Sequence, residues 1–180
     1  MRQDLVVRSL NRKAASGVAT IGPLVLHCGL GRAGMTAQKR EGDGATPIGR
    51  WPITNVLYRP DRLRGLHLSS VQRKGRPIGI RNGWCDAVGD RNYNRPVQHP
   101  YPATAEALWR EDHLYDVIVI LGHNRRPRVQ GGGSAIFMHL ARELDGGGIG
   151  PTAGCVSLRR RDLALVLRLL RPGSAVHVVG

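Results

Sequence analysis

Apolar residues in this chain fall mostly in short runs that are rich in β-branched side chains, a pattern typical of strands. Turns rich in glycine and proline separate the runs, for example at 29–34 and 42–49. The pattern predicts strands at residues 4–8, 19–28, 51–58, 116–121, 134–140, 155–158 and 175–179.

Two other stretches predict helices. Residues 103–112 contain good helix formers and no breaker. In residues 159–170, apolar side chains recur at i, i+3, i+4 and i+7 from Leu163, and a Pro-Gly pair follows. Many strands and few helices predict a β-rich α+β fold, a sandwich or barrel-like sheet with one or two packed helices.

The length of the chain sets the expected domain organisation. Its 180 residues are enough for one domain with a substantial core, so we expect a single domain over 1–180. Residues 59–103 show little periodicity and predict a long insert, of the kind that often carries function in a compact domain.

The candidate chemistry lies in residues 137–158, which contain a histidine and a cysteine around a glycine-rich loop. Alternation predicts that His139 lies near the end of a strand. A cysteine nucleophile needs a nearby base and backbone N–H groups for an oxyanion, and Gly154 and Cys155 are the candidate donors. A free cysteine and a strand histidine are also common as packing residues. Spacing alone therefore leaves catalysis and packing open.

Two motifs together resemble a known family. Fifteen residues separate His139 from Cys155, which ends the run Thr152-Ala153-Gly154-Cys155 and precedes an aliphatic residue. This pattern resembles the signature of L,D-transpeptidases with a YkuD-like catalytic domain. The run Thr46-Pro47-Ile48-Gly49 resembles the Thr-Pro-x-Gly strand entry of that family, and the resemblance extends from about residue 18 to the C-terminus.

The chain also departs from the family pattern. Leu140 follows the histidine where a glycine is usual, and Ser157 stands where many members have arginine or asparagine. The insert around Trp84 is not part of the commonest pattern. These departures bear on the choice of substrate more than on the nucleophile.

The resemblance implies an L,D-transpeptidase that links peptidoglycan stem peptides through a cysteine acyl-enzyme. Cys155 would be the nucleophile, His139 the base, Gly154 and Cys155 the oxyanion donors, and Thr152 would shape the turn. No metal and no organic cofactor are expected, and carbapenem-type β-lactams are expected to acylate Cys155. The crosslink would join L-Ala to diaminopimelate (1–3 type) or two diaminopimelates (3–3 type). The alternatives are an L,D-carboxypeptidase or hydrolase with the same site, and a non-catalytic basic module that binds the cell wall.

Four further residues are candidates for contact with the substrate. Arg91 and Tyr93 lie in a turn-rich loop that, beside Trp84, would form a wall for a carboxylate of the stem peptide. The alternative is an ordinary loop held by Asx-type hydrogen bonds. His123 closes an apolar strand and would either line the cleft or lie in a surface turn.

Charge and hydropathy limit the partners and the location. The net charge of +14 suits a carboxylate-rich substrate and an anionic cell wall, and the arginines are scattered with no nucleic-acid-binding motif. We therefore expect no nucleic-acid partner. No run approaches the roughly 20 apolar residues of a membrane span, so membrane insertion is not expected. Charged residues interrupt the first apolar run, so no signal peptide is evident, and a periplasmic or wall-associated location is expected from the implied activity alone.

Three cysteines occur, and no two have the spacing of a metal or redox motif. In an oxidising compartment Cys28 and Cys85 are a possible disulfide pair, and Cys155 would remain a free thiol.

Overall fold

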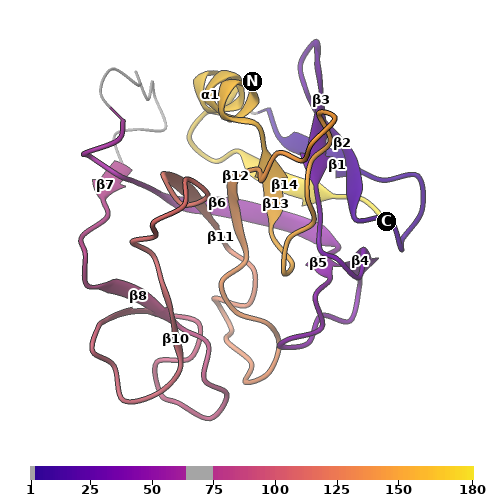
Figure 1. The fold of residues 1–180 in the computed structure, drawn as a ribbon. Coiled ribbons are helices and arrows are strands. Elements are labelled where there is room, and N and C mark those ends of the chain that lie inside the picture. The colour runs from indigo at the N-terminus through magenta and orange to yellow at the C-terminus, as the bar shows by residue number, and fades with distance from the viewer. Residues whose placement is uncertain (1–2, 64–74) are drawn as a thin grey trace.

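The computed structural model describes residues 3–63 and 75–180, and a closed sheet dominates it (Figure 1). The strands of this sheet are β1 (Leu5–Arg8), β2 (Ser16–Ile21), β3 (Leu24–Gly29), β6 (Gly49–Tyr58), β7 (Gly75–Pro77), β11 (Val117–Leu121), β12 (Phe137–Leu140), β13 (Val156–Leu158) and β14 (Ala175–Val178). Their order is β11-β12-β13-β3-β2-β1-β14-β6-β7. Because β11 also pairs with β6, the sheet closes into a barrel, with β7 as a branch beyond β6.

Two small sheets and one helix complete the described structure. Strands β4 (Met35–Thr36) and β5 (Thr46–Pro47) pair in parallel, and β8 (Asn82–Cys85), β9 (Pro96–Gln98) and β10 (Ala105–Ala107) form a three-stranded sheet in the order β10-β8-β9. In Figure 1, β8 and β10 lie at the opposite end of the molecule from helix α1 (Arg160–Leu169). We call β8, β9 and β10 the insert sheet. A closed sheet with one packed helix confirms the predicted β-rich α+β fold.

The two hydrophobic cores meet at β11, β12 and β13. Successive side chains of a strand point to opposite faces. Along β12, Met138 and Leu140 enter the larger core, where the apolar face of α1 also packs. Phe137, on the other face, enters a second core against Trp84 of the insert sheet. Strand β13 continues the pattern, because Val156 and Leu158 belong to the larger core while Cys155, just before the strand, belongs to the second.

The helix predicted at 103–112 is wrong. Residues Ala105–Ala107 form β10, which pairs antiparallel with β8, and the rest of the stretch consists of bends and irregular residues. A helix of about ten residues is marginal on its own, so pairing with β8 overrides local propensity here. The helix predicted at 159–170 is confirmed as α1.

Two predicted strands also need correction. Residues 19–28 form parts of two strands, β2 and β3, joined at Gly22, whose φ of +54° requires the left-handed region. The strand predicted at 134–140 begins only at Phe137. Residues 59–103 contain β7, β8 and β9 in their described part, so this stretch has more regular structure than the sequence pattern indicated. Residues 64–74 of the predicted insert lie outside the described residues.

All three cysteines are free thiols. Cys28 lies on β3 of the barrel and Cys85 on β8 of the insert sheet, so the pair suggested by the sequence is not formed. In the described part of the chain, no helix is long and apolar enough to cross a membrane.

Candidate active site

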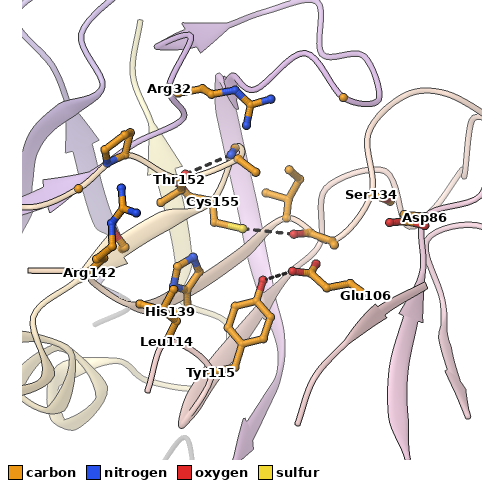
Figure 2. A pocket seen from close by; sticks show the side chains of 18 of the residues that line it. Arg32, Asp86, Glu106, Leu114, Tyr115, Ser134, His139, Arg142, Thr152 and Cys155 are labelled. Atoms are coloured by element: carbon orange, nitrogen blue, oxygen red, sulfur yellow. Dashed lines mark hydrogen bonds between the residues drawn. The ribbon is translucent and has the colours of Figure 1, made fainter. Parts of the chain in front are cut away.

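The register of two neighbouring strands brings the histidine and the cysteine to one face of the sheet. In the parallel pair β12–β13, His139 lies opposite Ser157. Cys155 precedes Ser157 by two positions and therefore points to the same face as His139. Both side chains line a cavity of about 490 Å³ between the barrel and the insert sheet (Figure 2).

The thiol of Cys155 is held by the segment that leads into β12. Its S–H group donates to the carbonyl of Ala135 at 3.3 Å, and Sγ accepts from the N–H group of Phe137 at 3.4 Å. Ala135 has a φ of +51°, an uncommon conformation for a residue with a side chain. Such strain persists only where the surroundings enforce it.

Asn94 supplies part of that constraint. Its Oδ1 accepts both the N–H group of Ala135 at 3.2 Å and the indole N–H group of Trp84 at 2.9 Å. Its Nδ2 donates to the backbone carbonyl of Asn124 at 2.8 Å. The insert thus fixes the carbonyl that faces the thiol.

The imidazole of His139 is oriented by a backbone carbonyl. Nδ1 lies 2.8 Å from the oxygen of Leu140, and because a carbonyl can only accept, Nδ1 carries the proton. The neutral ring therefore presents Nε2 as its basic atom. The ring of Tyr115 packs edge-on against the imidazole at 5.2 Å between centroids.

Burial keeps both reactive groups neutral. Desolvation lowers the pKa of His139 to about 4 and, together with a smaller effect of the Glu106 carboxylate, raises the pKa of Cys155 to about 12. The resting pair is therefore a thiol and a neutral imidazole rather than an ion pair. If the thiol acts as a nucleophile, a proton must leave Cys155, and the neutral imidazole of His139 on the same face could accept it.

Two threonines hold the turn before β13. The hydroxyl of Thr152 donates to the carbonyl of Cys155 at 2.7 Å and accepts the N–H group of Gly154 at 3.1 Å. The hydroxyl of Thr46 accepts the N–H group of Gly31 at 2.8 Å and donates to the same Cys155 carbonyl at 3.4 Å. The Thr-Pro-x-Gly run of the sequence thus contacts the backbone of Cys155 directly.

The turn requires glycine at position 154. Its φ is +144°, and a Cβ there would lie 3.0 Å from the carbonyl of Ala45. The N–H group of Gly154, one of the two predicted oxyanion donors, is engaged by Thr152, so its use as a donor needs that bond to be exchanged.

Comparison with protein families matches the chain to one model. Residues 12–178 match the L,D-transpeptidase catalytic domain, YkuD. The chain belongs to this family. It is an enzyme of the L,D-transpeptidase kind, and the match covers both sequence motifs. No curated protein and no solved structure matches the chain significantly.

The four residues predicted to contact the substrate lie outside the cavity of this L,D-transpeptidase domain. Trp84 and Tyr93 are fully buried, Arg91 is exposed, and His123 lines a second, smaller cavity with Trp51. Trp84 acts on the site through Asn94. A direct contact between these four residues and the substrate stays a prediction.

Sequence reasoning missed several side chains that do line the cavity of the L,D-transpeptidase domain. These are Arg32, Asp86, Glu106, Tyr115 and Arg142. Glu106 lies in the stretch 103–112 that was predicted to be a helix. The others stand in turns or irregular segments without a pattern that singles them out. Among the described residues, no group of three or more His, Cys, Asp and Glu side chains is placed to hold a metal ion.

Proposed function

We propose that this L,D-transpeptidase links peptidoglycan stem peptides through a thioester on Cys155, with His139 as the proton carrier. The observation that carries the proposal is the shared face of β12 and β13, which directs both side chains into one cavity. Membership of the family supports the substrate class. The cationic surface suits a substrate that carries several carboxylates.

In the first half-reaction, the thiol attacks the carbonyl carbon of the donor peptide bond. His139 takes the thiol proton as the sulfur–carbon bond forms, and then gives it to the leaving amine as the carbon–nitrogen bond breaks. Proton transfer of this kind is worth about 10²–10⁴-fold in rate. The N–H groups of Cys155 and Gly154 would stabilise the oxyanion, the latter once Thr152 releases it.

In the second half-reaction, an amine of another stem peptide attacks the thioester. It loses a proton to His139, its nitrogen bonds to the carbonyl carbon, and the sulfur leaves and recovers the proton. Water in place of the amine would give hydrolysis, as an L,D-carboxypeptidase does. The same thiol is the proposed site of acylation by carbapenem-type β-lactams, and the activity implies a periplasmic or wall-associated location.

Incubation with purified muropeptides tests the proposal. We expect crosslinked dimers by mass spectrometry, a transient acyl adduct on Cys155, and neither product with Cys155→Ala. Fragmentation of the dimer identifies the crosslink as 1–3 or 3–3. Dimers formed by Cys155→Ala would refute the mechanism, and shortened monomers without dimers would replace transfer by hydrolysis.

A further inference from the structure

Two pairs of side chains with opposite charge line the cavity around Cys155, which is also lined by Lys39, Glu41 and Arg110. In Figure 2, Arg32 and Arg142 lie on one side of Cys155 and His139, and Glu106 and Asp86 lie on the other. The acidic wall belongs to the insert sheet, because Glu106 is on β10 and Asp86 follows β8. We call these two pairs the basic wall and the acidic wall.

Neither residue of the acidic wall forms an ion pair within the described chain. Arg110, which also lines the cavity, pairs directly with Asp112 and attracts the Glu106 carboxylate without forming an ion pair with it. Asp86 Oδ1 is shielded from solvent and has no hydrogen-bond partner among the described residues. A shielded carboxylate oxygen without a partner is costly, so a cationic ligand group is a natural complement to Asp86 Oδ1.

A buried hydroxyl lies on the same side of the cavity. Ser134 is 7% exposed and, apart from an approach to the Tyr93 hydroxyl, its Oγ has no hydrogen-bond partner among the described residues. Ser134 and Asp86 both line the cavity. An ammonium group has three donors, and this wall offers several oxygen acceptors for them.

The acidic wall is also connected to the base. The hydroxyl of Tyr115 donates to Glu106 Oε1 at 2.6 Å, and the same ring packs against His139. An ammonium group bound at Glu106 would therefore lie near the group that must receive its proton. This geometry points to the incoming amine rather than to the acyl donor.

The basic wall is built over glycines. A Cβ at Gly150 would lie 2.9 Å from Arg142 Nε, and one at Gly44 would lie 3.1 Å from Arg32 Nε. Neither guanidinium forms an ion pair with a described residue. Arginine is well suited to bind carboxylates with two parallel hydrogen bonds.

We propose that the acidic wall binds the ammonium group of the acceptor peptide and that the basic wall binds substrate carboxylates. This proposal rests on the proposed function and deepens it. The insert sheet then determines the choice of the acceptor, and the barrel side of the cavity recognises the donor. An amine held at Glu106 and Asp86 competes with water for the thioester, so the acidic wall also favours transfer over hydrolysis.

A binding experiment tests the two walls without any chemistry. In Cys155→Ala protein, NMR titrations use cadaverine, which has two ammonium groups, and pimelate, which has two carboxylates on a chain of similar length. We expect Glu106→Gln and Asp86→Asn to weaken cadaverine binding about tenfold or more and to leave pimelate binding unchanged. Arg32→Gln and Arg142→Gln should show the reverse.

Two control variants remove one carboxylate and one guanidinium charge at positions outside the cavity. Glu111→Gln and Arg161→Gln alter exposed side chains that do not line the cavity, and both should bind the two probes like the parent. Glutamine at 106 can still accept the Tyr115 hydroxyl, and backbone NMR spectra check the fold of each variant. Equal weakening of cadaverine binding by Glu111→Gln, or none by Glu106→Gln and Asp86→Asn, would overturn the proposal.

Product analysis adds a second readout. With muropeptides, Glu106→Gln and Asp86→Asn should shift the products from dimers to hydrolysed monomers. If the charge-specific binding holds but the wild-type enzyme forms no dimer, only the proposed crosslinking function fails. If dimers form and their ratio to hydrolysed monomers is the same in the acidic-wall variants, only the inference about the acceptor fails.

Discussion

The two faces of β12 and β13 differ in what they do. The inner face carries Met138, Leu140, Val156 and Leu158, all buried in the larger core with the helix. The outer face carries Phe137 and His139 on β12, and Cys155 and Ser157 on or beside β13. A single register therefore places core residues on one side of two strands and the candidate catalytic residues on the other.

The difference lies in what covers each face. The inner face packs against strands of the barrel and against the helix, within a large cluster of apolar side chains. The outer face is covered by the insert sheet, which leaves a cavity with charged walls. The same burial that packs Phe137 shifts the pKa values of His139 and Cys155. A functional face can thus be almost as buried as a core face and still admit a ligand.

The largest expected effect is a loss of activity without a loss of stability, caused by a change on the outer face. Cys155→Ala removes the proposed nucleophile, and loss of a covalent catalyst costs at least about 10³-fold in rate. Because the thiol makes only two weak hydrogen bonds, the melting temperature should stay within a few degrees of the wild type. Crosslinking assays and calorimetry measure the two quantities. Retained activity would assign the chemistry to another residue.

The matched change on the inner face should do the opposite. Leu158→Ala opens a cavity in the larger core, where the side chain is fully buried, and should lower the free energy of unfolding by about 2–5 kcal/mol. Below the melting temperature, acylation of Cys155 should continue at a rate close to that of the wild type. Chemical denaturation and mass spectrometry of the adduct check this. A loss of acylation in folded protein would show that the faces are coupled.

Much of the inner face could be predicted from the sequence, because alternation and helical periodicity are local signals. The strands at 51–58 and 116–121 and the helix at 159–170 appear close to their predicted bounds as β6, β11 and α1. The β-rich α+β class follows from such elements. Strand order and barrel closure depend on contacts distant in the sequence and have no local pattern.

The outer face was predictable only in part. His139 and Cys155 were found by spacing and resemblance, while their shared cavity depends on the register between β12 and β13. Glu106 was assigned to a helix because residues 103–112 have helical propensity, and its place on the wall results from pairing of β10 with β8. Arg32 and Arg142 stand in turns, where a single sequence carries no signal for orientation.

Lowering the pH should reduce the free energy of unfolding through His139 on the outer face. Burial lowers the pKa of His139 from its usual 6.5 to about 4 on folding, so the unfolded chain binds the proton more readily. Stability from this group is present above pH 6.5 and is lost as the pH falls through about 4, in total roughly 3 kcal/mol. Denaturation from pH 7 to 4 should show a smaller loss for His139→Gln than for the wild type. His27→Gln, an exposed position, should behave like the wild type.

The acid limb of the pH–rate profile gives the matching kinetic test. The rate of Cys155 acylation should stay high below pH 6 and fall with an apparent pKa near 4, because His139 remains an unprotonated base until then. A midpoint near 6.5 would mean that the imidazole is solvated when the enzyme acts, which would weaken the contrast between the faces.

The smallest expected effect concerns the turn that precedes β13. Thr152→Val keeps the shape of the side chain but removes the hydroxyl between the Gly154 N–H group and the Cys155 carbonyl. We expect a loss of about 1 kcal/mol in the free energy of unfolding. Acylation should slow severalfold, because the Cys155 backbone loses one of its two threonine contacts while Thr46 keeps the other. Thr152→Ser, which keeps the hydroxyl, should stay close to the wild type in both denaturation and acylation. Faster acylation in Thr152→Val would instead indicate that release of the Gly154 N–H group for the oxyanion outweighs the loss of support.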